Sequence, residues 1–414
     1  MLTNSPILHS FRRLKSTASS SQVIRLISTR VYTWGLGTDG QLGHAKFEET
    51  TGVLGSSYDQ EEPRKLYKSN PFTKLAIGLE FTLSLTNRGE LYGWGKGYVA
   101  GKKSFTPESI PIPVRMTQIA AGANHSAAIG EDGLVYTWGK EGSWMSGGGQ
   151  LGHGEREDVP YPKLVEGFAA MNIKAASVCC GSAHTHILTE DREVLSFGMG
   201  EYGRLGLGSN TDSLEPVSVE GLVHEEIIQV VTGQSHSLAL TQDGRVYSWG
   251  KNDNGQLGTA DSFMDMYSME AFPHLLDSSE AFQGMKITQV AAGKARSAAV
   301  TEDGRLFIWG HKLTHTPVLL PETAFEGKKI KKIVCGGGVG KSGTAVITED
   351  SELWTFGDAK SHLLGRSGLS NTMVFRELPT PEKVPLFENR NVIDIFAGLG
   401  QHMGAIVEEE KKEI

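Results

Sequence analysis

The sequence predicts an all-β fold, a seven-bladed β-propeller closed by pairing of its N- and C-terminal strands. A tryptophan or phenylalanine followed by glycine recurs seven times, and six of these sites lie 16 residues after an earlier glycine. A repeat of roughly 50 residues is typical of propellers and solenoids. The first and last copies are each incomplete, which favours a closed ring. The complete copies are marked by Gly78 and Trp94, Gly122 and Trp138, Gly181 and Phe197, Gly233 and Trp249, Gly293 and Trp309, and Gly340 and Phe356.

The seventh copy is split between the two ends of the chain. Trp34 has no glycine partner before it, and Gly398 has no aromatic partner after it. Joined head to tail, the two fragments make one complete unit. The 414 residues, 51 of them glycine, are therefore expected to form one repeat domain rich in turns, instead of several ordinary domains.

Each copy has the pattern of a blade of short antiparallel strands. Asp243-Gly244 separates two short apolar runs, and Asp-Gly between such runs is a strong hairpin signal because glycine accepts a positive φ. We therefore expect Ser237–Leu240 and Arg245–Trp249 to pair. Arg192 and Ser351 replace the turn glycine in two other copies, which predicts a different turn type there.

A second glycine signal, Gly-Gln-Leu-Gly, follows the aromatic strand and predicts a tight loop with the leucine as an apolar plug. The tryptophan at the strand end is large enough to fill the space between neighbouring blades. Histidines recur in the same frame, but a propeller spreads equivalent positions around a ring, so we expect them to form hydrogen bonds instead of binding a metal. The loops are Gly40–Gly43, Gly149–Gly152 and Gly255–Gly258, with Arg204-Leu205-Gly206 as a variant, and the histidines are His125, His184 and His236.

Residues 1–30 have the composition of a mitochondrial presequence, or transit peptide. They carry five basic residues and many Ser and Thr, and the first acidic residue of the chain is Asp39. Ile7, Phe11 and Leu14 share one face of a helix, which is the kind of apolar stripe that such a leader presents. A basic tail without targeting function is the alternative.

The rest of the chain is acidic. Without the five basic residues of the leader, 35 of the 40 Lys and Arg remain against 48 Asp and Glu, a net charge of −13. This charge makes nucleic acid unlikely as the main partner, because nucleic-acid binding depends on neutralising phosphates. The basic cluster Lys328, Lys329, Lys331 and Lys332 is either a solvated strand edge or a contact for RNA or acidic lipid. No run of residues approaches the ~18 consecutive apolar residues of a membrane span.

The sequence offers no motif for catalysis, a cofactor or a metal. Its three cysteines lack the spacing of a disulfide framework or a zinc site. Packing as buried thiols accounts for Cys179, Cys180 and Cys335, with redox sensing by the adjacent pair as the alternative. We therefore expect a binding or regulatory protein that is not an enzyme and has no catalytic, cofactor-binding or metal-binding residues.

The frame A-G-x-x-H-S-x-A-x-T-x-D-G-x-V-Y-x-W-G followed by G-Q-L-G resembles the regulator of chromosome condensation repeat family. It is clearest at Ala121–Gly139 and Gly233–Gly258 and extends over about residues 31–408, leaving 409–414 as a charged tail. The resemblance implies a seven-bladed propeller whose last blade takes strands from both termini. Val392–Val407 would then pair with Arg30–Trp34.

Members of this family serve as guanine nucleotide exchange factors, chromatin-docking proteins, ubiquitin-ligase modules, light sensors and inhibitors. The leader makes this chain resemble the mitochondrial members. The resemblance implies a protein-binding scaffold or assembly factor in mitoribosome or respiratory-complex biogenesis, in the matrix or on the matrix face of the inner membrane, with peripheral membrane contact. The alternative is a guanine nucleotide exchange factor for a mitochondrial GTPase.

Two interruptions of the repeat are the expected partner-binding sites. The loop after Trp138 displays Trp144 and Met145 between glycines, as anchors for a partner or as side chains that fold back on their own blade. The insertion Thr259–Lys286 contains Phe263, Met264, Met266 and Tyr267, followed by Met269 and Phe272. We expect an amphipathic helix there, which either touches a partner or membrane or caps the propeller.

The leader prediction is tested by fusing residues 1–30 to a fluorescent reporter. We expect the fusion to enter mitochondria, because its basic charge responds to the membrane potential and its apolar stripe can dock on an import receptor. Replacing Arg12 and Arg13 by Gln should reduce import. A fusion that stays in the cytosol would remove the basis for the mitochondrial location.

Overall fold

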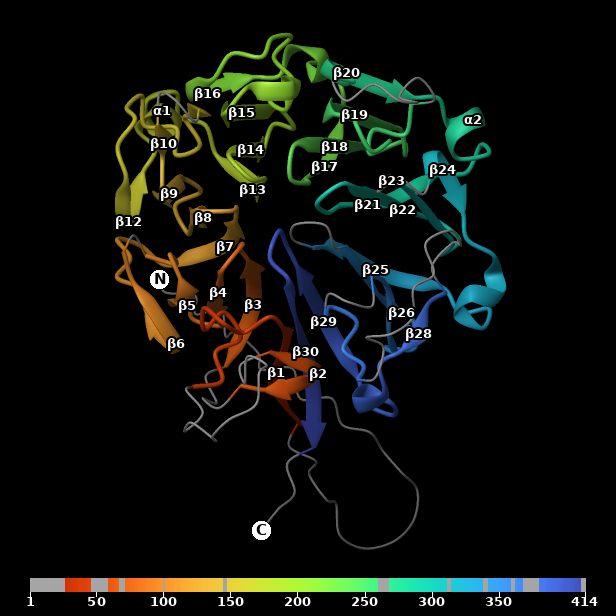
Figure 1. Cartoon of the computed structure of the whole chain (residues 1–414). Helices are drawn as coiled ribbons and strands as arrows, with labels where there is room; N and C mark the ends of the chain where they lie inside the picture. Colours follow the sequence, from red (N-terminus) through yellow and green to blue (C-terminus); the bar gives the residue numbers. More distant parts are fainter. Residues whose placement is uncertain are drawn as a thin grey trace, which may run out of the picture.

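The computed structural model describes residues 27–45, 59–66, 71–99, 101–143, 147–259, 268–310, 314–337, 342–358, 362–367 and 380–410. These residues form seven four-stranded antiparallel sheets arranged as blades around a central axis (Figure 1). The prediction of a seven-bladed β-propeller is confirmed. A small two-stranded sheet lies on one blade.

We number the blades along the chain and give the strands of each from the axis outward. Blade 1 holds β29 (Val392–Ala397), β30 (His402–Glu410), β1 (Ile27–Gly35) and β2 (Gln60–Lys65). Blade 2 holds β3 (Phe72–Ile77), β4 (Phe81–Thr86), β5 (Leu91–Lys96) and β6 (Lys103–Ser109). Blade 3 holds β7 (Met116–Ala121), β8 (His125–Gly130), β9 (Val135–Gly139) and β12 (Val159–Leu164), and carries the small sheet of β10 (Gly142–Ser143) and β11 (Gly147–Gly148).

The remaining blades follow the same order. Blade 4 holds β13 (Ala175–Cys180), β14 (His184–Thr189), β15 (Val194–Gly198) and β16 (Ser213–Ser218). Blade 5 holds β17 (Ile227–Thr232), β18 (His236–Thr241), β19 (Val246–Lys251) and β20 (Met269–Leu276). Blade 6 holds β21 (Ile287–Ala292), β22 (Arg296–Thr301), β23 (Leu306–Gly310) and β24 (Thr314–Leu319), and blade 7 holds β25 (Ile330–Gly336), β26 (Gly343–Thr348), β27 (Leu353–Gly357) and β28 (Glu382–Lys383).

Short helical turns link the outer strand of one blade to the inner strand of the next. They are α1 (Glu166–Ala170), η2 (Glu220–Leu222), α2 (Ser278–Ala281), η4 (Glu322–Phe325) and η6 (Pro385–Phe387), while η1 (Glu201–Gly203) lies in the loop after β15. The connectors bury an apolar side chain in or beside their turn, such as Phe282 against Trp309 and Phe387 against Trp34. Each blade is thus joined to the next by an apolar plug.

The first and last described strands close the ring. β1 pairs with β30 along its whole length, from Ile27 opposite Glu410 to Gly35 opposite His402, and β29 pairs with the other side of β30. The expected pairing of the two chain ends is confirmed. The strands extend beyond the predicted limits of residues 31 and 408. Residues 1–26 and 411–414 lie outside the described residues, so the division into leader, propeller and tail stays a prediction.

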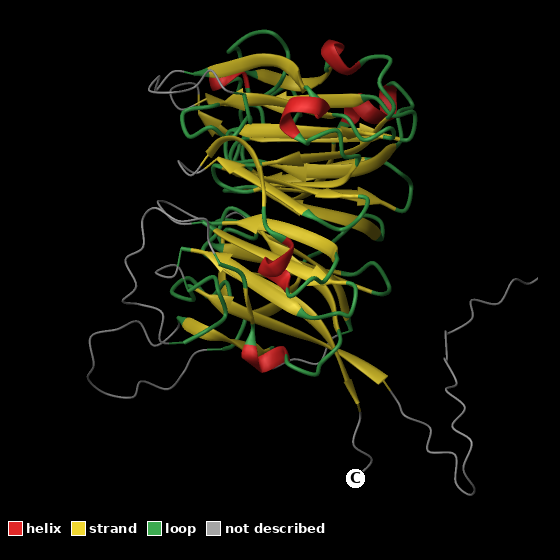
Figure 2. Ribbon diagram, turned by 90° about the vertical axis from the view of Figure 1, so that its right-hand side faces the viewer, coloured by secondary structure: helices red, strands yellow, loops and turns green. Residues whose placement is uncertain are grey.

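The ring has two different faces (Figure 2). On one face, which we call the loop face, lie the turns between the first and second strands and the long loops between the third and fourth. On the other, the hairpin face, lie the turns between the second and third strands and the connectors between blades. The described residues on either side of the two predicted partner-binding segments therefore lie on the loop face.

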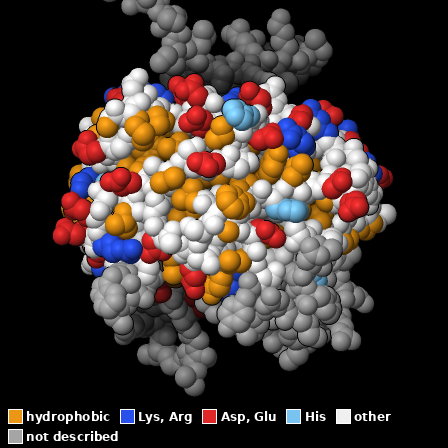
Figure 3. Space-filling model, turned by 90° about the horizontal axis from the view of Figure 1, so that it is seen from above, with side chains coloured by type: hydrophobic (Ala, Val, Ile, Leu, Met, Phe, Trp, Pro, Cys, Tyr) orange, Lys and Arg blue, Asp and Glu red, His pale blue; other side chains and the backbone are white. Residues whose placement is uncertain are grey.

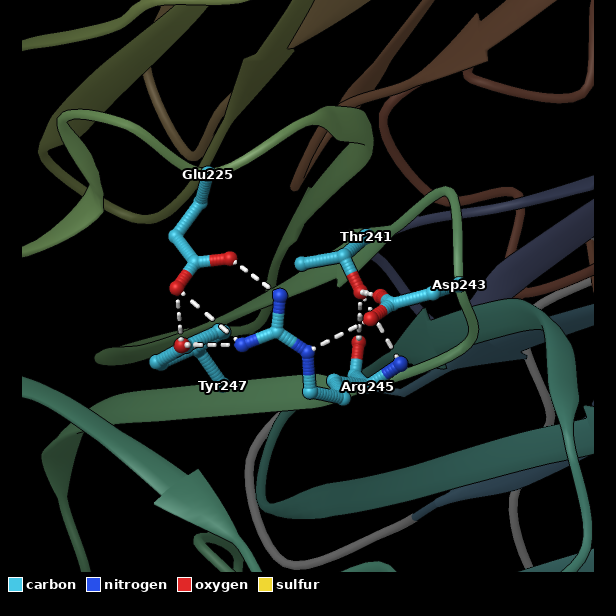
Figure 4. Close-up of polar contacts among 5 residues, drawn as sticks. All are labelled: Glu225, Thr241, Asp243, Arg245 and Tyr247. Atoms are coloured by element: carbon cyan, nitrogen blue, oxygen red, sulfur yellow. Dashed lines mark hydrogen bonds and ion pairs between the residues drawn. The ribbon is translucent and has the colours of Figure 1, made fainter.

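The hairpin prediction holds, but the predicted change of turn type is wrong. β18 and β19 pair across Asp243-Gly244, where Thr241 Oγ1 donates to Asp243 and accepts from Arg245 N at 2.9 Å (Figure 4). Arg192 and Ser351 adopt left-handed φ values of 70° and 68° and keep the same turn as the glycines. The strand register imposes this turn, at a local cost of roughly 1–2 kcal/mol for a residue with a side chain.

Tryptophan side chains hydrogen-bond one blade to the preceding one. The Trp138 indole is fully buried, and its Nε1 donates to the Tyr98 carbonyl of blade 2 at 3.0 Å. The same bond recurs in four other blades, where the acceptor is again the second residue of the Gly-Gln-Leu-Gly tetrapeptide, or of its equivalent, on the preceding blade. These pairs are Trp34 to Leu363, Trp94 to Gln41, Trp249 to Arg204 and Trp309 to Gln256.

The histidines form a second set of bonds between blades. His125 Nε2 lies 3.0 Å from Thr185 Oγ1 of blade 4, and this hydroxyl donates to the Gln150 carbonyl at 2.9 Å. Because the hydroxyl proton is used, Nε2 must carry the proton and donate. Burial lowers the pKa of His125 to about 3, so the ring is neutral. A Cβ at Gly122 would lie 2.2 Å from this ring, which explains the recurrent glycine.

The contribution of the indole bond is measurable in Trp138→Phe. We expect the free energy of unfolding to fall by about 1–3 kcal/mol, because the buried Tyr98 carbonyl loses its donor while the ring volume is nearly kept. Phe197 and Phe356 show that the position tolerates phenylalanine. The matched control is Trp354→Phe, whose indole bonds Glu352 within its own blade and should cost less. Equal urea midpoints for Trp138→Phe and the wild type would count against this bond.

Candidate functional site

The predicted partner-binding residues Trp144, Met145, Phe263, Met264, Met266 and Tyr267 lie outside the described residues. The structure describes the chain on either side of both segments. The expectation of an amphipathic helix is wrong for residues 269–276, because these form β20, paired in register with β19. The helical part of the insertion that the structure describes is the single turn α2.

The strands β10 and β11 bring the ends of the Trp144 segment together on the loop face. Gly148 N donates to Asp212 Oδ2 at 3.1 Å, and Asp212 Oδ1 accepts from Gly200 N at 2.9 Å. Arg156 pairs with the same carboxylate at 3.0 Å. Asp212 of blade 4 thus fastens the hairpin of blade 3 to the loop that follows β15.

The buried carboxylate of Glu141 holds the residues that directly follow the same hairpin. Glu141 has no exposed surface, and its two oxygens accept from Gly149 N at 2.5 Å and Leu151 N at 2.9 Å. Burial raises the pKa of Glu141 to about 7, outweighing the two N–H donors and the nearby Arg156, which favour the charged form. The charge of this carboxylate therefore changes near neutral pH.

Asn252 plays the equivalent part in blade 5. Its Oδ1 accepts from Leu257 N at 3.0 Å, its Nδ2 donates to Thr259 Oγ1 at 3.0 Å, and its backbone N donates to the Ser268 carbonyl at 2.8 Å. The two ends of the 260–267 segment are thus held close together on the loop face.

Tyr202 lies in the blade 4 loop that both neighbours contact. The ring has Lys251 Nζ of blade 5 at 4.5 Å and Arg204 Cζ at 5.5 Å from its centroid. Its φ of 62° is a left-handed value that costs a bulky residue roughly 1–3 kcal/mol. Backbone strain in an aromatic residue is a feature of binding and switch sites more than of regular turns.

We call the β10–β11 hairpin, the loop Gly200–Leu207 and the segment Lys251–Thr259 the loop-face site. Gly147 lies against Met199 of blade 4, and Tyr202 lies against Lys251 of blade 5, so the three parts are contiguous. Sequence reasoning missed Tyr202. The sequence feature that could have indicated Tyr202 is the replacement of glutamine by Arg204 in the Gly-Gln-Leu-Gly tetrapeptide. This replacement places a cation beside the aromatic ring.

The histidine frame has a structural role. Burial lowers the pKa of His236 and His402, like that of His125, to about 3, and each Nε2 lies near a hydroxyl of the next blade. In the part of the chain that the structure describes, no group of three or more His, Cys, Asp or Glu side chains is placed to hold a metal.

The cysteines and the basic cluster are also accounted for by packing. Burial raises the pKa of Cys179 to about 12, so the adjacent thiols are uncharged and poor nucleophiles. Lys328 pairs with Asp350 at 2.7 Å and Glu352 at 2.5 Å, and Lys332 pairs with Asp394. These two lysines are neutralised by carboxylates, which disfavours a phosphate contact.

The profile of the RCC1-like domain matches residues 9–269, and that of the regulator of chromosome condensation (RCC1) repeat matches residues 243–300. The chain belongs to the RCC1 repeat family. The frame identified in the sequence is therefore a true family signature, and the seven blades are RCC1 repeats.

RCC1 relatives differ in length and role. The chain is 34% identical over 309 residues to the Arabidopsis thaliana ultraviolet-B receptor UVR8, covering 72% of this chain and 64% of the receptor. It is 32% identical over 295 residues to the A. thaliana mitochondrial RCC1 domain-containing protein RUG3, covering 68% and 61%. It is 29% identical to the human E3 ubiquitin-protein ligase HERC2 over 93% of this chain but 8% of the ligase. The chain thus spans less than two thirds of each of these relatives.

Two solved RCC1 propellers share the whole fold. Human WBSCR16 superposes with a TM-score of 0.76 at 23% identity, covering 92% of this chain and 99% of that one. Prp20p from Saccharomyces cerevisiae, whose structure was described with its binding to Gsp1p and histones, superposes with a TM-score of 0.75 at 20% identity, covering 93% and 92%. No helix among the described residues is long and apolar enough to cross a membrane.

The buried carboxylate makes the loop-face site of this RCC1 protein sensitive to pH. Because the folded pKa of Glu141 is raised above its ordinary 4.5, its contribution to stability is present below about pH 4.5 and is lost as the pH rises to about 7. We expect the free energy of unfolding of the wild type to fall between about pH 5 and about pH 8, and to fall more steeply than that of Glu141→Gln. Below pH 7 the difference between the two slopes should be up to about 1.4 kcal/mol per pH unit.

Urea unfolding at the two pH values measures this difference. The reciprocal variant is Asn252→Asp, which places a carboxylate at the equivalent point of blade 5 and should gain a pH dependence. Parallel pH profiles for the wild type and Glu141→Gln would contradict the assignment.

Proposed function

We propose that this RCC1 protein is a mitochondrial protein-binding scaffold or assembly factor, acting in mitoribosome or respiratory-complex biogenesis at the matrix or the matrix face of the inner membrane. The observation that carries the binding role is the strained Tyr202 between two cations, in a blade 4 loop that both neighbouring blades contact. Tyrosine and arginine are enriched among residues that dominate binding energy, and they work best near the centre of a contact.

Two findings support the mitochondrial setting. The leader-like composition of residues 1–30 is one, and the likeness to RUG3, a mitochondrial RCC1 protein, is the other. The site also offers scaffold geometry. The described residues that flank Trp144 and Met145 and those that flank the 260–267 segment lie on the loop face on either side of the Tyr202 loop, so we expect a partner to contact three successive blades.

Guanine nucleotide exchange on a mitochondrial GTPase is the alternative. It is supported by the fold shared with Prp20p, a protein that binds Gsp1p. Exchange needs no acid, base or metal, since it follows from binding the nucleotide-free state of the GTPase more tightly than the loaded state. The two roles are therefore separated by assay and not by chemistry in the site.

Proximity labelling in mitochondria, with wild type, Tyr202→Ala and Trp144→Ala, tests the scaffold role. We expect wild type to label ribosomal or respiratory-complex subunits and each variant to bind the recovered partner at least about tenfold more weakly, because truncating a dominant contact costs about 2 kcal/mol or more. Tyr202→Phe keeps the ring and is the matched control.

A nucleotide-release assay on any GTPase that is recovered decides the alternative. Faster release with wild type, lost in Trp144→Ala while the fold is kept, would favour exchange. Labelling of no assembly subunit, or full partner binding by Tyr202→Ala, would refute the scaffold role at this site.

A further inference from the structure

The outer strand of blades 1 to 6 bulges away from its neighbour, and the bulge ends in proline. In blade 5, Gly250 pairs with Glu270 and Ser248 with His274, so Ala271, Phe272 and Pro273 form the bulge. The same register break recurs in blades 1, 2, 3, 4 and 6. The residues at the centre of these bulges are Glu62, Thr106, Tyr161, Glu215, Phe272 and Thr316.

Four of these six central residues are polar, and two are aromatic. Tyr161 is 40% exposed, and Phe272 is 57% exposed. Phe272 thus places an aromatic ring in solvent where equivalent blades use threonine or glutamate. Strand pairing does not require it there, since the same bulge forms without it.

Phe272 belongs to an apolar surface on the rim of blades 4 and 5. We call Val217, Val223, Met269, Phe272 and Leu275, all exposed, the rim patch. The two blades form one continuous surface here, because the Phe272 ring lies over Gly208 and Pro273 lies over Gly221 of blade 4. Figure 3 shows apolar side chains gathered on this rim with carboxylates among them. Patches of this kind on a soluble protein mark interaction sites.

The rim patch is surrounded by acidic residues. The two segments that form it, residues 213–226 and 269–281, contain no Lys or Arg. Arg245, which reaches this surface from β19, is already paired with Glu225 at 2.6 Å and Asp243 at 2.9 Å (Figure 4). The acidic residues of the two segments are Glu215, Glu220, Glu225, Glu226, Glu270, Asp277 and Glu280.

Blade 3 shows what an aromatic ring at the bulge can bind. Lys102 Nζ of the preceding blade lies 5.7 Å from the centroid of the Tyr161 ring. A cation over an aromatic face is stabilised by about 0.5–1 kcal/mol at exposed sites. The chain therefore already uses this position to hold an ammonium group.

We propose that the rim patch is a docking surface for a basic amphipathic helix of a partner protein. The helix would lay its apolar face on Met269, Phe272 and Leu275 and direct its Lys and Arg side chains toward Glu270 and Glu280. An anionic membrane would be repelled by the same carboxylates. Pairing of a partner strand along β20 is blocked by the bulge and by Pro273, which lacks an N–H donor. The proposal rests on the protein-binding role and names the chemistry of one partner.

Fluorescence anisotropy with the full-length protein tests the proposal. The probe is a labelled amphipathic helical peptide of leucine and lysine, compared with a scrambled peptide of the same composition. We expect the helical peptide to bind at least tenfold more tightly than the scrambled one, and added salt to weaken it.

Phe272→Thr, which installs the residue that blade 6 uses, should weaken binding about tenfold, and the pair Glu270→Gln and Glu280→Gln should flatten the salt dependence. Ile393→Thr is the matched control, because Ile393 is 38% exposed on another part of the ring. An unchanged circular dichroism melt shows that each variant is folded.

Three results would overturn the proposal. They are equal binding of the two peptides, equal binding by wild type and Phe272→Thr, and binding to vesicles containing phosphatidylserine in preference to the helical peptide. The assay does not depend on mitochondria or on the loop-face site. If the helical peptide binds but proximity labelling recovers no assembly subunit, the proposed function is refuted and the docking role of the rim patch is retained.

Discussion

The structure depends on one recurring acceptor, the backbone carbonyl of the second residue of the Gly-Gln-Leu-Gly tetrapeptide or its variant, which follows the third strand in six of the blades. In the Gln41 and Gln256 loops this oxygen receives both the indole N–H and a buried hydroxyl of the next blade. Each of these hydroxyls, on Thr82 and Ser297, also lies within hydrogen-bond distance of the Nε2 of a neutral histidine, His402 and His236 respectively. Such bonds are strong in a dry interface and expensive to leave unmade. They hold neighbouring blades together across a buried interface. Burial keeps the histidines there neutral, and the His125 and His236 rings leave no room for a side chain at the recurrent glycine, which together explain why the repeat is so regular.

The two candidate binding surfaces lie where the chain departs from the repeat pattern. The frame histidines and the blade-end tryptophans that the structure describes are buried between blades, so they do not present a chemical group to solvent. The loop-face site arises where Tyr202 and Arg204 replace the usual loop residues, and the rim patch where Phe272 replaces a polar bulge residue. The loop-face site extends over blades 3 to 5 and the rim patch over blades 4 and 5, so this part of the ring carries two distinct surfaces, one mixed in charge on the loop face and one apolar and acidic on the rim.

The sequence predicts the architecture well because every blade repeats the same short-range signals. The aromatic spacing, the Asp-Gly turn and the incomplete terminal copies are local, and they require the observed strands and closure. The sequence-based prediction of local structure failed where pairing with a neighbouring strand determines the backbone conformation. Arg192 and Ser351 keep the left-handed turn because paired strands leave no other path, and residues 269–276 form a strand because β19 offers an edge. Tyr202 escapes sequence reasoning because its partner Lys251 lies on another blade, 49 residues away. Met269 and Phe272 stand out in the sequence, but their joining with Val217 and Val223 of blade 4 into one rim patch does not, because that contact is also between blades.

The pairing of β1 with β30 also governs the order of folding. The two strands are separated by nearly the whole chain, so their contact carries the largest loop-closure entropy in the molecule, and that entropy grows only slowly with length. Six blades can form as each segment leaves the ribosome or an import channel, but the ring stays open until the final strand arrives. Until then the facing surfaces of blades 2 and 7 have no neighbour. The chain is thus an open arc with two unpaired blade surfaces for most of its synthesis, and it becomes a closed ring in one late step.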